Sequence, residues 1–430
     1  MSLLNIEINK LNLLRAKADF LPTLNAYASH GYNFGRTLDP LSNEFATDRV
    51  RSNSFSLNSS FTVFEGFLKS TKLKQEQLNQ KAGMYDSDQI RNDVTLSVAS
   101  AFLQILFDQE LLDIAREQLE ISRQQKEHTQ LLVDAGKLAQ GDLLDIKSQY
   151  ASEELNVTNA QNALDIATLT LKQLLYLPSD QEFSIIRPVL NFNTTQNLLL
   201  SSDVVFQTAS EVQPSVLAAE TRVQVAEKTI SIAKSGMFPR INVSASYGTG
   251  YSDLRTEITD MQVDGYDTIG ITSDGASVLT PSYNIATQPI KFYDQLDNNV
   301  SQSVNFSMNI PIFNGLATRT SVSKAKIGLE SAMLDLENTK DKLEKTIQQA
   351  YADAKAALAK YRSTKDQTEA MEESFKYAQK KFDVGMITAV DYNDAKNKLT
   401  KSKSDLLQAK YEFVFNTKVL DFYMGKPIDF

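Results

Sequence analysis

The chain has 430 residues, 42% hydrophobic and 23% charged, which is enough apolar material for a large core and excludes a disordered chain. Its formal net charge is -9 and it has no long run of Lys or Arg, so a nucleic-acid-binding surface is not expected. The absence of cysteine excludes disulfides, cysteine-zinc sites and a lipidated cysteine within it, and two histidines leave little for catalysis or metal binding. Neither a cofactor nor a metal site is therefore expected.

The chain begins with MSLLNIEINK, which lacks the charged, apolar and small-residue regions of a signal peptide. No segment reaches the length of about 18 apolar residues that a membrane-spanning helix needs. The longest uncharged apolar candidate, Val94 to Phe107, has 14 residues and includes Ser, Thr and Gln. Such a chain would have to cross a membrane with strands.

Comparison of the chain with itself reveals an internal duplication. Residues 16–29 match residues 233–246 at an offset of 217, and residues 61–66 match residues 310–315 at an offset of 249. Three further pairs keep the offset of 249, namely Gly136 with Gly385, Asp142 with Asp391, and Pro178 with Pro427. The offset changes once, by 32 residues, which places an insertion in the second copy between about Gly250 and Asn299.

Each copy reads in order as two strands, a very long helix, a glycine break and a shorter helix. In the first copy, 1–217, we expect strands at about 22–34 and 53–64, a long helix at 66–134 and a helix at 141–176. In the second copy, 218–430, we expect strands at about 239–249 and 300–313, a long helix at 315–383 and a helix at 388–424. Residues 178–213 would form the connecting segment.

The predicted strands alternate apolar residues with uncharged polar ones. Phe55, Leu57 and Phe61 alternate with Ser and Asn in the first copy, as Phe306 and Met308 do in the second. Strands of about ten residues with this pattern fit a tilted membrane strand, and the pattern also fits a soluble sandwich sheet. The polar insertion, residues 249–284, breaks the duplication and is expected to be a surface loop.

The long helices need neighbours. At 1.5 Å per residue, each would span roughly 100 Å, which is too long for a compact domain. Apolar residues recur every seven positions in both shorter helices, which predicts a left-handed coiled coil: Leu143, Tyr150, Val157, Leu164 and Leu171, then Tyr392, Leu399, Leu406, Phe413 and Leu420. Each long helix is expected to fold back antiparallel on the shorter helix that follows it. Four strands cannot close a barrel, so two, three or four copies must share one.

The order and spacing of these features resemble the TolC-like outer membrane efflux protein family over nearly the whole chain. The sequences that carry the resemblance are FLP and MFP before the strands, VFEG and IFNG after them, and the turns DAGKLAQGDLLD and DVGMITAVDYND. The resemblance implies a mixed, mainly α, internally duplicated fold. Long antiparallel coiled-coil helices would form an α-barrel tunnel, and four strands per chain would contribute to a shared 12-stranded transmembrane β-barrel in a trimer.

The resemblance also implies a passive exit duct for efflux or type I secretion in the outer membrane of a Gram-negative bacterium, with a long periplasmic extension. Its partners would be a periplasmic adaptor (membrane fusion) protein and an inner-membrane transporter. The insertion would lie at the outer mouth. Because Met1 falls opposite Ala218 in the duplication, the first copy is expected to be N-terminally truncated, with a signal peptide and a first helical segment upstream.

Two sets of site residues follow from the resemblance. Contact with the adaptor is assigned to the hairpin tips, at Ala135, Gly136, Lys137, Leu138, Val384, Gly385 and Met386. Asp391 and Asp394, with Asp142 of the other hairpin, would form a cation-selective constriction at the periplasmic gate. In the best-known members a tyrosine and an arginine tie the closed gate to an aspartate. Here those positions hold Phe382 and Ile387, so the tie is expected to differ.

Simpler explanations cover part of this pattern. Gly385 suits a left-handed residue after a helix, and Thr388 with Asp391 fits a capping box, although capping does not explain Asp394. For the whole protein, the alternative is a structural coiled-coil scaffold with a small soluble β-domain. An enzyme is not expected, because acidic pairs occur only where helix caps and tunnel lining account for them.

Overall fold

The computed structural model describes residues 2–35, 37–38, 45–46, 49–178, 180–188 and 201–428. It divides into two compact units. The sheet unit comprises Lys10–Gln77 and Ala226–Gly328, and the helical unit comprises Met1–Asn9, Leu78–Val225 and Leu329–Phe430. Each unit therefore takes segments from both sequence copies. Of the predicted connecting segment 178–213, residues 179 and 189–200 lie outside the described part of the chain.

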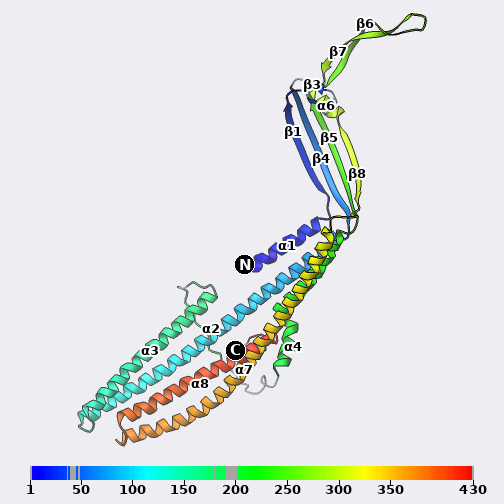
Figure 1. The fold of residues 1–430 in the computed structure, drawn as a ribbon. Coiled ribbons are helices and arrows are strands. Elements are labelled where there is room, and N and C mark those ends of the chain that lie inside the picture. The colour runs from blue at the N-terminus through cyan, green and yellow to red at the C-terminus, as the bar shows by residue number, and fades with distance from the viewer. Residues whose placement is uncertain are drawn as a thin grey trace. The chain divides into compact units, whose positions relative to one another are not determined.

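The sheet unit holds a four-stranded antiparallel sheet in the order β1-β4-β5-β8 (Figure 1). Its strands are β1 (Thr23–Asn33), β4 (Val50–Glu65), β5 (Arg240–Ser252) and β8 (Ser301–Asn309). The last strand is shorter than predicted, since it ends at Asn309 instead of residue 313. Pro311 follows, and a proline has no N–H to continue a ladder of hydrogen bonds.

The sheet has one apolar and one polar face, as the alternation in the sequence predicts. Phe61 pairs with Val243, which pairs with Phe306, so the three side chains share a face. On the other face Ser60 pairs with Ser244. The apolar side chains are open to their surroundings: Phe306 is 77% exposed. A register shift between Thr62 and Phe64 marks a bulge, so the alternation of the predicted strand at 53–64 is interrupted near its end.

The two ends of the sheet have different connections. At one end, β1 follows the helix α1 (Ser2–Ala18), and β5 follows α5 (Pro214–Ser235). At the same end, Glu65 pairs with Arg240 and Arg240 with Asn309, so β4 and β8 leave there toward their long helices. The opposite end carries the short strands β2 (Thr37–Leu38) and β3 (Phe45–Ala46) and the insertion.

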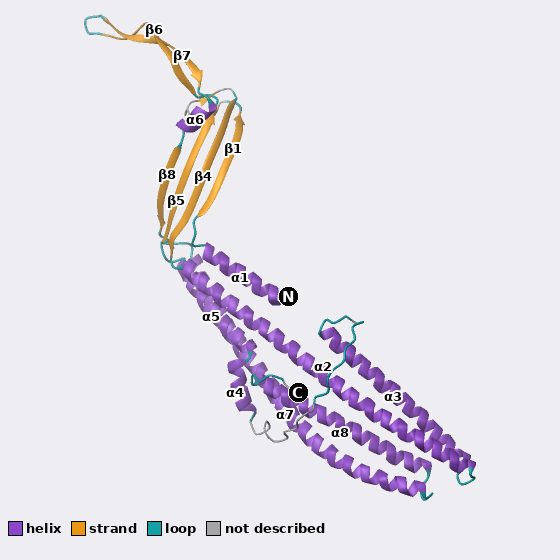
Figure 2. Cartoon of the chain, turned by 180° about the vertical axis from the view of Figure 1, so that it is seen from behind, coloured by secondary structure: helices purple, strands orange, loops and turns teal. Residues whose placement is uncertain are grey.

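The insertion is not the surface loop that the sequence predicted. It forms a long two-stranded ribbon, β6 (Thr256–Ile271) with β7 (Ser277–Pro289), followed by the short helix α6 (Phe292–Asn298). Figures 1 and 2 show the ribbon as a separate hairpin. The prediction failed because register shifts interrupt the period-two alternation of β6 three times.

Four helices form two hairpins: α2 (Leu68–Asp134) with α3 (Gln140–Leu174), and α7 (Ala317–Asp383) with α8 (Ala389–Tyr423). Each long helix starts two residues later than predicted, because Gly66, Phe67, Gly315 and Leu316 have positive φ angles. α4 (Ser202–Val212) lies in the predicted connecting segment. Among the described residues, no helix is both long enough and apolar enough to cross a membrane.

Both hairpins are antiparallel within the helical unit, as predicted. In the first, Arg116 of α2 donates to Gln161 of α3 (3.2 Å), and Lys126 lies over the Tyr150 ring, 3.7 Å from its centroid. In the second, Thr368 and Ser402 share a buried hydrogen bond of 2.8 Å, which their small side chains permit. Most residues of the two predicted series spaced by seven are buried: Leu143, Leu171, Tyr392, Leu399, Phe413 and Leu420. The others are half-buried: Tyr150, Val157, Leu164 and Leu406.

Candidate functional site

The turns that join the helices of each hairpin have the same backbone geometry. Gly136 and Gly385 both have φ of +72°, in the left-handed region that favours glycine. In the first turn, the N–H of Gly136 donates to the carbonyl of Val133 (2.8 Å) and that of Lys137 to the carbonyl of Leu132 (2.9 Å). The turn at Gly385 repeats both hydrogen bonds, so each long helix ends in a Schellman motif. A Cβ at Gly385 would meet no atom within 4 Å, so its backbone angle alone requires glycine.

The second tip presents apolar side chains to solvent. Val384 is 70% exposed and Met386 is 72% exposed, on either side of Gly385. The first tip is more polar, with Ala135, Gly136 and Lys137 exposed and Leu138 half-buried. The predicted contact residues therefore lie together at each turn, and nearly all are accessible to a partner.

Asp391 and Asp142 cap the helices that follow the two turns. The Thr388 hydroxyl donates to Asp391 Oδ2 (2.8 Å), and the Thr388 N–H donates to the same oxygen (3.2 Å). These hydrogen bonds lower the pKa of Asp391 below its ordinary value. Asp142 accepts only one such hydrogen bond, from the N–H of Ala139 (3.3 Å). The hydrogen bond from a hydroxyl is missing because the alanine side chain has none.

A complete cap in the first hairpin should stabilise it. Ala139→Thr is expected to raise the free energy of unfolding by about 1 kcal/mol, because Ala139 already has the extended backbone of an N-cap, with φ of -76° and ψ of 152°. Thr388→Ala should lower it by a similar amount. Thermal denaturation of both variants measures the effect, and no change in either would contradict the capping role.

Asp394 has a local partner as well. Its carboxylate lies 2.6 Å from the ammonium of Lys398, one turn along α8, and both side chains are about three-fifths exposed (60% and 61%). The structure thus adds a cation next to the predicted constriction residues, which sequence reasoning missed although the spacing of four is typical of helical ion pairs.

The positions expected to hold a different tie, Phe382 and Ile387, contribute to an apolar cluster. The centroid of the Tyr392 ring lies 5.0 Å from that of Phe382 and 5.5 Å from that of Phe375. Ile146 of α3 belongs to the same cluster, so the cluster joins the two hairpins close to their turns. Burial raises the pKa of Tyr392 to about 12.

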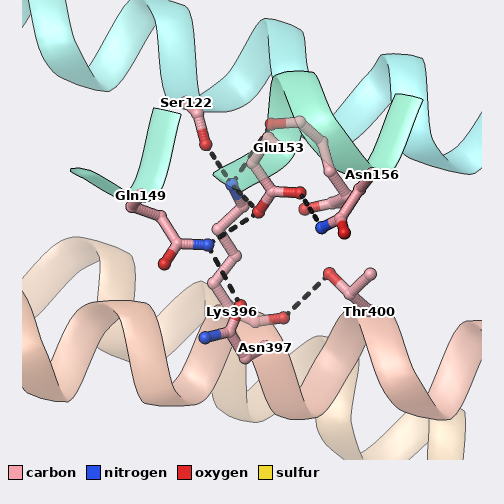
Figure 3. A network of polar contacts seen from close by, with 8 residues as sticks. Ser122, Gln149, Glu153, Asn156, Lys396, Asn397 and Thr400 are labelled. Atoms are coloured by element: carbon pink, nitrogen blue, oxygen red, sulfur yellow. Dashed lines mark hydrogen bonds and ion pairs between the residues drawn. The ribbon is translucent and has the colours of Figure 1, made fainter. Parts of the chain in front are cut away.

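A buried ion pair joins the hairpins slightly farther from the turns (Figure 3). Lys396 of α8 lies 3.2 Å from Glu153 of α3, and the two side chains are only 2% and 4% exposed. The Lys396 ammonium also donates to the carbonyl of Gln118 (3.1 Å) and to the hydroxyl of Ser122, both on α2. One side chain of the second copy therefore holds both helices of the first.

The Glu153 carboxylate is fully partnered. Gln149 donates to Oε1 (2.8 Å) and Asn156 donates to Oε2 (3.1 Å), in addition to the contact with Lys396. Burial alone would raise the pKa of Glu153, but the Lys396 ammonium and the two amides more than offset this and hold the pKa below its ordinary value. Burial lowers the pKa of Lys396, and Glu153 offsets part of that shift.

The sequence contains a signal for this pair that the prediction did not use. Ile146, Glu153, Ala160 and Ala167 are spaced by seven residues, and all four are buried. A carboxylate in an otherwise apolar series of sevens indicates a buried partner. The prediction followed the parallel series from Leu143 and so missed both Glu153 and Lys396.

Comparisons with known proteins agree with the fold. The sequence model of the family described as "Outer membrane efflux protein" matches residues 13–175 and 205–426, in two ranges as the duplication requires. The chain is 24% identical over 409 residues to the outer membrane protein TolC of Escherichia coli (strain K12), which covers 93% of this chain and 74% of TolC. It is 20% identical over 412 residues to the outer membrane efflux protein BepC of Brucella suis, covering 95% and 78% of the two chains.

Solved structures share the architecture. The outer membrane protein VceC of Vibrio cholerae superposes with a TM-score of 0.76 at 14% identity, over 100% of this chain and 93% of VceC. The Campylobacter jejuni CmeC outer membrane channel superposes with a TM-score of 0.72 at 13% identity, over 99% and 82% of the two chains. The predicted mainly α, internally duplicated fold is confirmed.

Proposed function

Because this chain belongs to the outer membrane efflux protein family, it is an exit duct of the Gram-negative outer membrane, and we propose that three copies form one conduit. The open sheet supports the number of copies. Within the described residues, β1 pairs only with β4 and β8 only with β5, so each copy has two unpaired edges. An unpaired edge is not tolerated in lipid, because its N–H and C=O groups would lack partners.

The strand directions allow these edges to pair between copies. β1 and β8 are the two outer strands and run antiparallel to each other, since three antiparallel pairings separate them. β8 of one copy would therefore pair antiparallel with β1 of the next. Three copies of four strands give twelve, and the exposed apolar face with Phe306 and Met308 would face lipid.

We propose that the conduit is passive and opens through its partners. The turns at Gly136 and Gly385 would contact a periplasmic adaptor, and an inner-membrane transporter would supply the energy. The exposed Val384 and Met386 support this role, because neighbouring exposed apolar side chains favour a protein contact.

We propose that Asp391 and Asp394 line a constriction at the entrance, near Asp142. Lys398 moderates its charge through the ion pair with Asp394. The apolar cluster around Tyr392 and the buried pair of Lys396 with Glu153 would hold the two hairpins together there. In this protein they would take the place of the tie that a tyrosine and an arginine make in the best-known family members, whose positions here hold Phe382 and Ile387.

The open sheet is the observation that carries the proposal, and detergent extraction tests it. We expect the full chain to require detergent, to migrate as a trimer in size-exclusion chromatography with light scattering, and to conduct ions in planar bilayers. A chain that dissolves without detergent as a monomer would instead support the scaffold alternative and overturn the duct.

A further inference from the structure

The ribbon of β6 and β7 has a regular pattern of bulges. Register shifts occur at Thr259, Asp264 and Ile269, which are five residues apart. Each bulge adds one residue to β6 and so shifts the alternation of the residues that follow by one position. Apolar residues that would otherwise lie on opposite faces of the ribbon therefore lie on the same face. The pattern therefore preserves one continuous apolar face along a ribbon whose sequence does not alternate strictly.

The register identifies that face. β7 has no bulge, so Ile285 and Tyr283 point to one side, and their partners Met261 and Val263 point to the same side. Eight large apolar side chains gather there, each between 47% and 73% exposed: Ile258, Met261, Val263, Tyr266, Ile271, Leu279, Tyr283 and Ile285. The opposite face carries Glu257, Asp260, Gln262, Asp267 and Asn284.

Such a ribbon needs a partner. A two-stranded hairpin is only marginally stable in water, and a contiguous exposed apolar face marks an interaction surface. The charge of the ribbon limits which partners can bind it. Residues 256–290 include no Lys or Arg and five acidic residues, Glu257, Asp260, Asp264, Asp267 and Asp274. Five carboxylates without a cation disfavour anionic lipid headgroups as the partner, and any contact must be made by the apolar face, with the acidic face left in water.

The position of the ribbon in the fold favours the same ribbon of other copies as its partner. The ribbon leaves the sheet beyond Ser252 of β5 and returns to Ser301 of β8, at the end opposite to the helix connections. In the proposed trimer, three ribbons would stand at one mouth at high effective concentration. We propose that their apolar faces pack against one another over the outer mouth, with the acidic faces toward water. This inference rests on the proposed trimeric duct.

Cysteine cross-linking tests the contact cleanly, because the chain has no cysteine of its own. Val263→Cys lies on the apolar face and the neighbouring Gln262→Cys on the polar face, so the two variants are matched. Cells that produce each full-length variant are treated with a short bismaleimide. We expect cross-linked dimers for Val263→Cys, because the single thiol of each chain can react with only one maleimide, and none for Gln262→Cys. We also expect Val263→Cys to react about tenfold more slowly with a water-soluble maleimide.

Equal cross-linking of the two variants, or equal labelling, would overturn the proposal. Slow labelling of Val263→Cys without cross-linking would also overturn it, because lipid or another protein would then cover the face. Light scattering of the same preparations separates the two levels of inference. A trimer without ribbon cross-links refutes only the ribbon contact, whereas a monomer refutes the duct itself.

Discussion

Replacing Lys396 with methionine should destabilise the protein by about 3–5 kcal/mol, because it leaves the Glu153 carboxylate buried without its cation. Glu153 is 4% exposed, so water cannot replace the lost partner. Thermal denaturation of the detergent-solubilised protein measures the change. If the junction also holds the entrance closed, Lys396→Met will show a higher single-channel conductance than the wild type.

Two further variants separate the buried pair from general effects of charge removal. Glu153→Met combined with Lys396→Met should recover most of the stability, since an apolar pair of similar volume leaves no unpaired charge. Lys398→Met removes an exposed cation from the same helix and should change the stability by less than about 1 kcal/mol. Equal losses in Lys396→Met and Lys398→Met would refute the role of the buried pair.

The pH dependence has a definite sign. The pKa of folded Glu153 lies below its ordinary value of 4.5, so the unfolded chain binds this proton more readily. The stabilisation is therefore present above pH 4.5 and is lost as pH falls through the folded pKa. Lys396→Met removes the group that lowers this pKa, and burial then raises it. The destabilisation by Lys396→Met should consequently shrink as the pH is lowered toward 4.5.

The sequence predicted the elements whose hydrophobic period is regular. The strands around Phe61 and Phe306 alternate with period two, and the helices from Leu143 and Tyr392 repeat with period seven, so both could be recognised without tertiary information. The family and its outer-membrane location were also predicted correctly. The β6–β7 ribbon was missed because its bulges break the alternation while preserving the face.

The residues of the candidate site were harder to predict. Gly385 and Thr388 follow local rules for ending and starting helices, and the structure has both features. The contact of Lys396 with Glu153 joins residues 243 positions apart, and it depends on how one hairpin packs on the other. Local spacing cannot specify such a partner, even where a charged residue in an apolar series indicates that one exists.

The charge at the proposed constriction should determine the ion selectivity of the channel. Each chain would contribute three carboxylates, Asp391, Asp394 and Asp142, and one ammonium, Lys398, so the proposed trimer would carry a net negative charge there. We expect the wild type to favour cations. Asp391→Asn with Asp394→Asn leaves Asp142 and Lys398, whose charges offset each other, and should shift the ratio of cation to anion permeability about tenfold toward anions. Reversal potentials in planar bilayers under a salt gradient measure this ratio.

Lys398→Gln provides the opposite change and the sharper test. It removes the cation paired with Asp394, so it should increase cation selectivity, whereas the double Asp variant should reduce it. Glu373→Gln removes an exposed carboxylate paired with Lys376 on α7 and serves as the matched control, with selectivity unchanged. If the double Asp variant and Lys398→Gln both behave like Glu373→Gln, these residues only cap and pair within α8. The constriction must then lie elsewhere, because charges that line a narrow passage cannot be changed without altering the ions it admits.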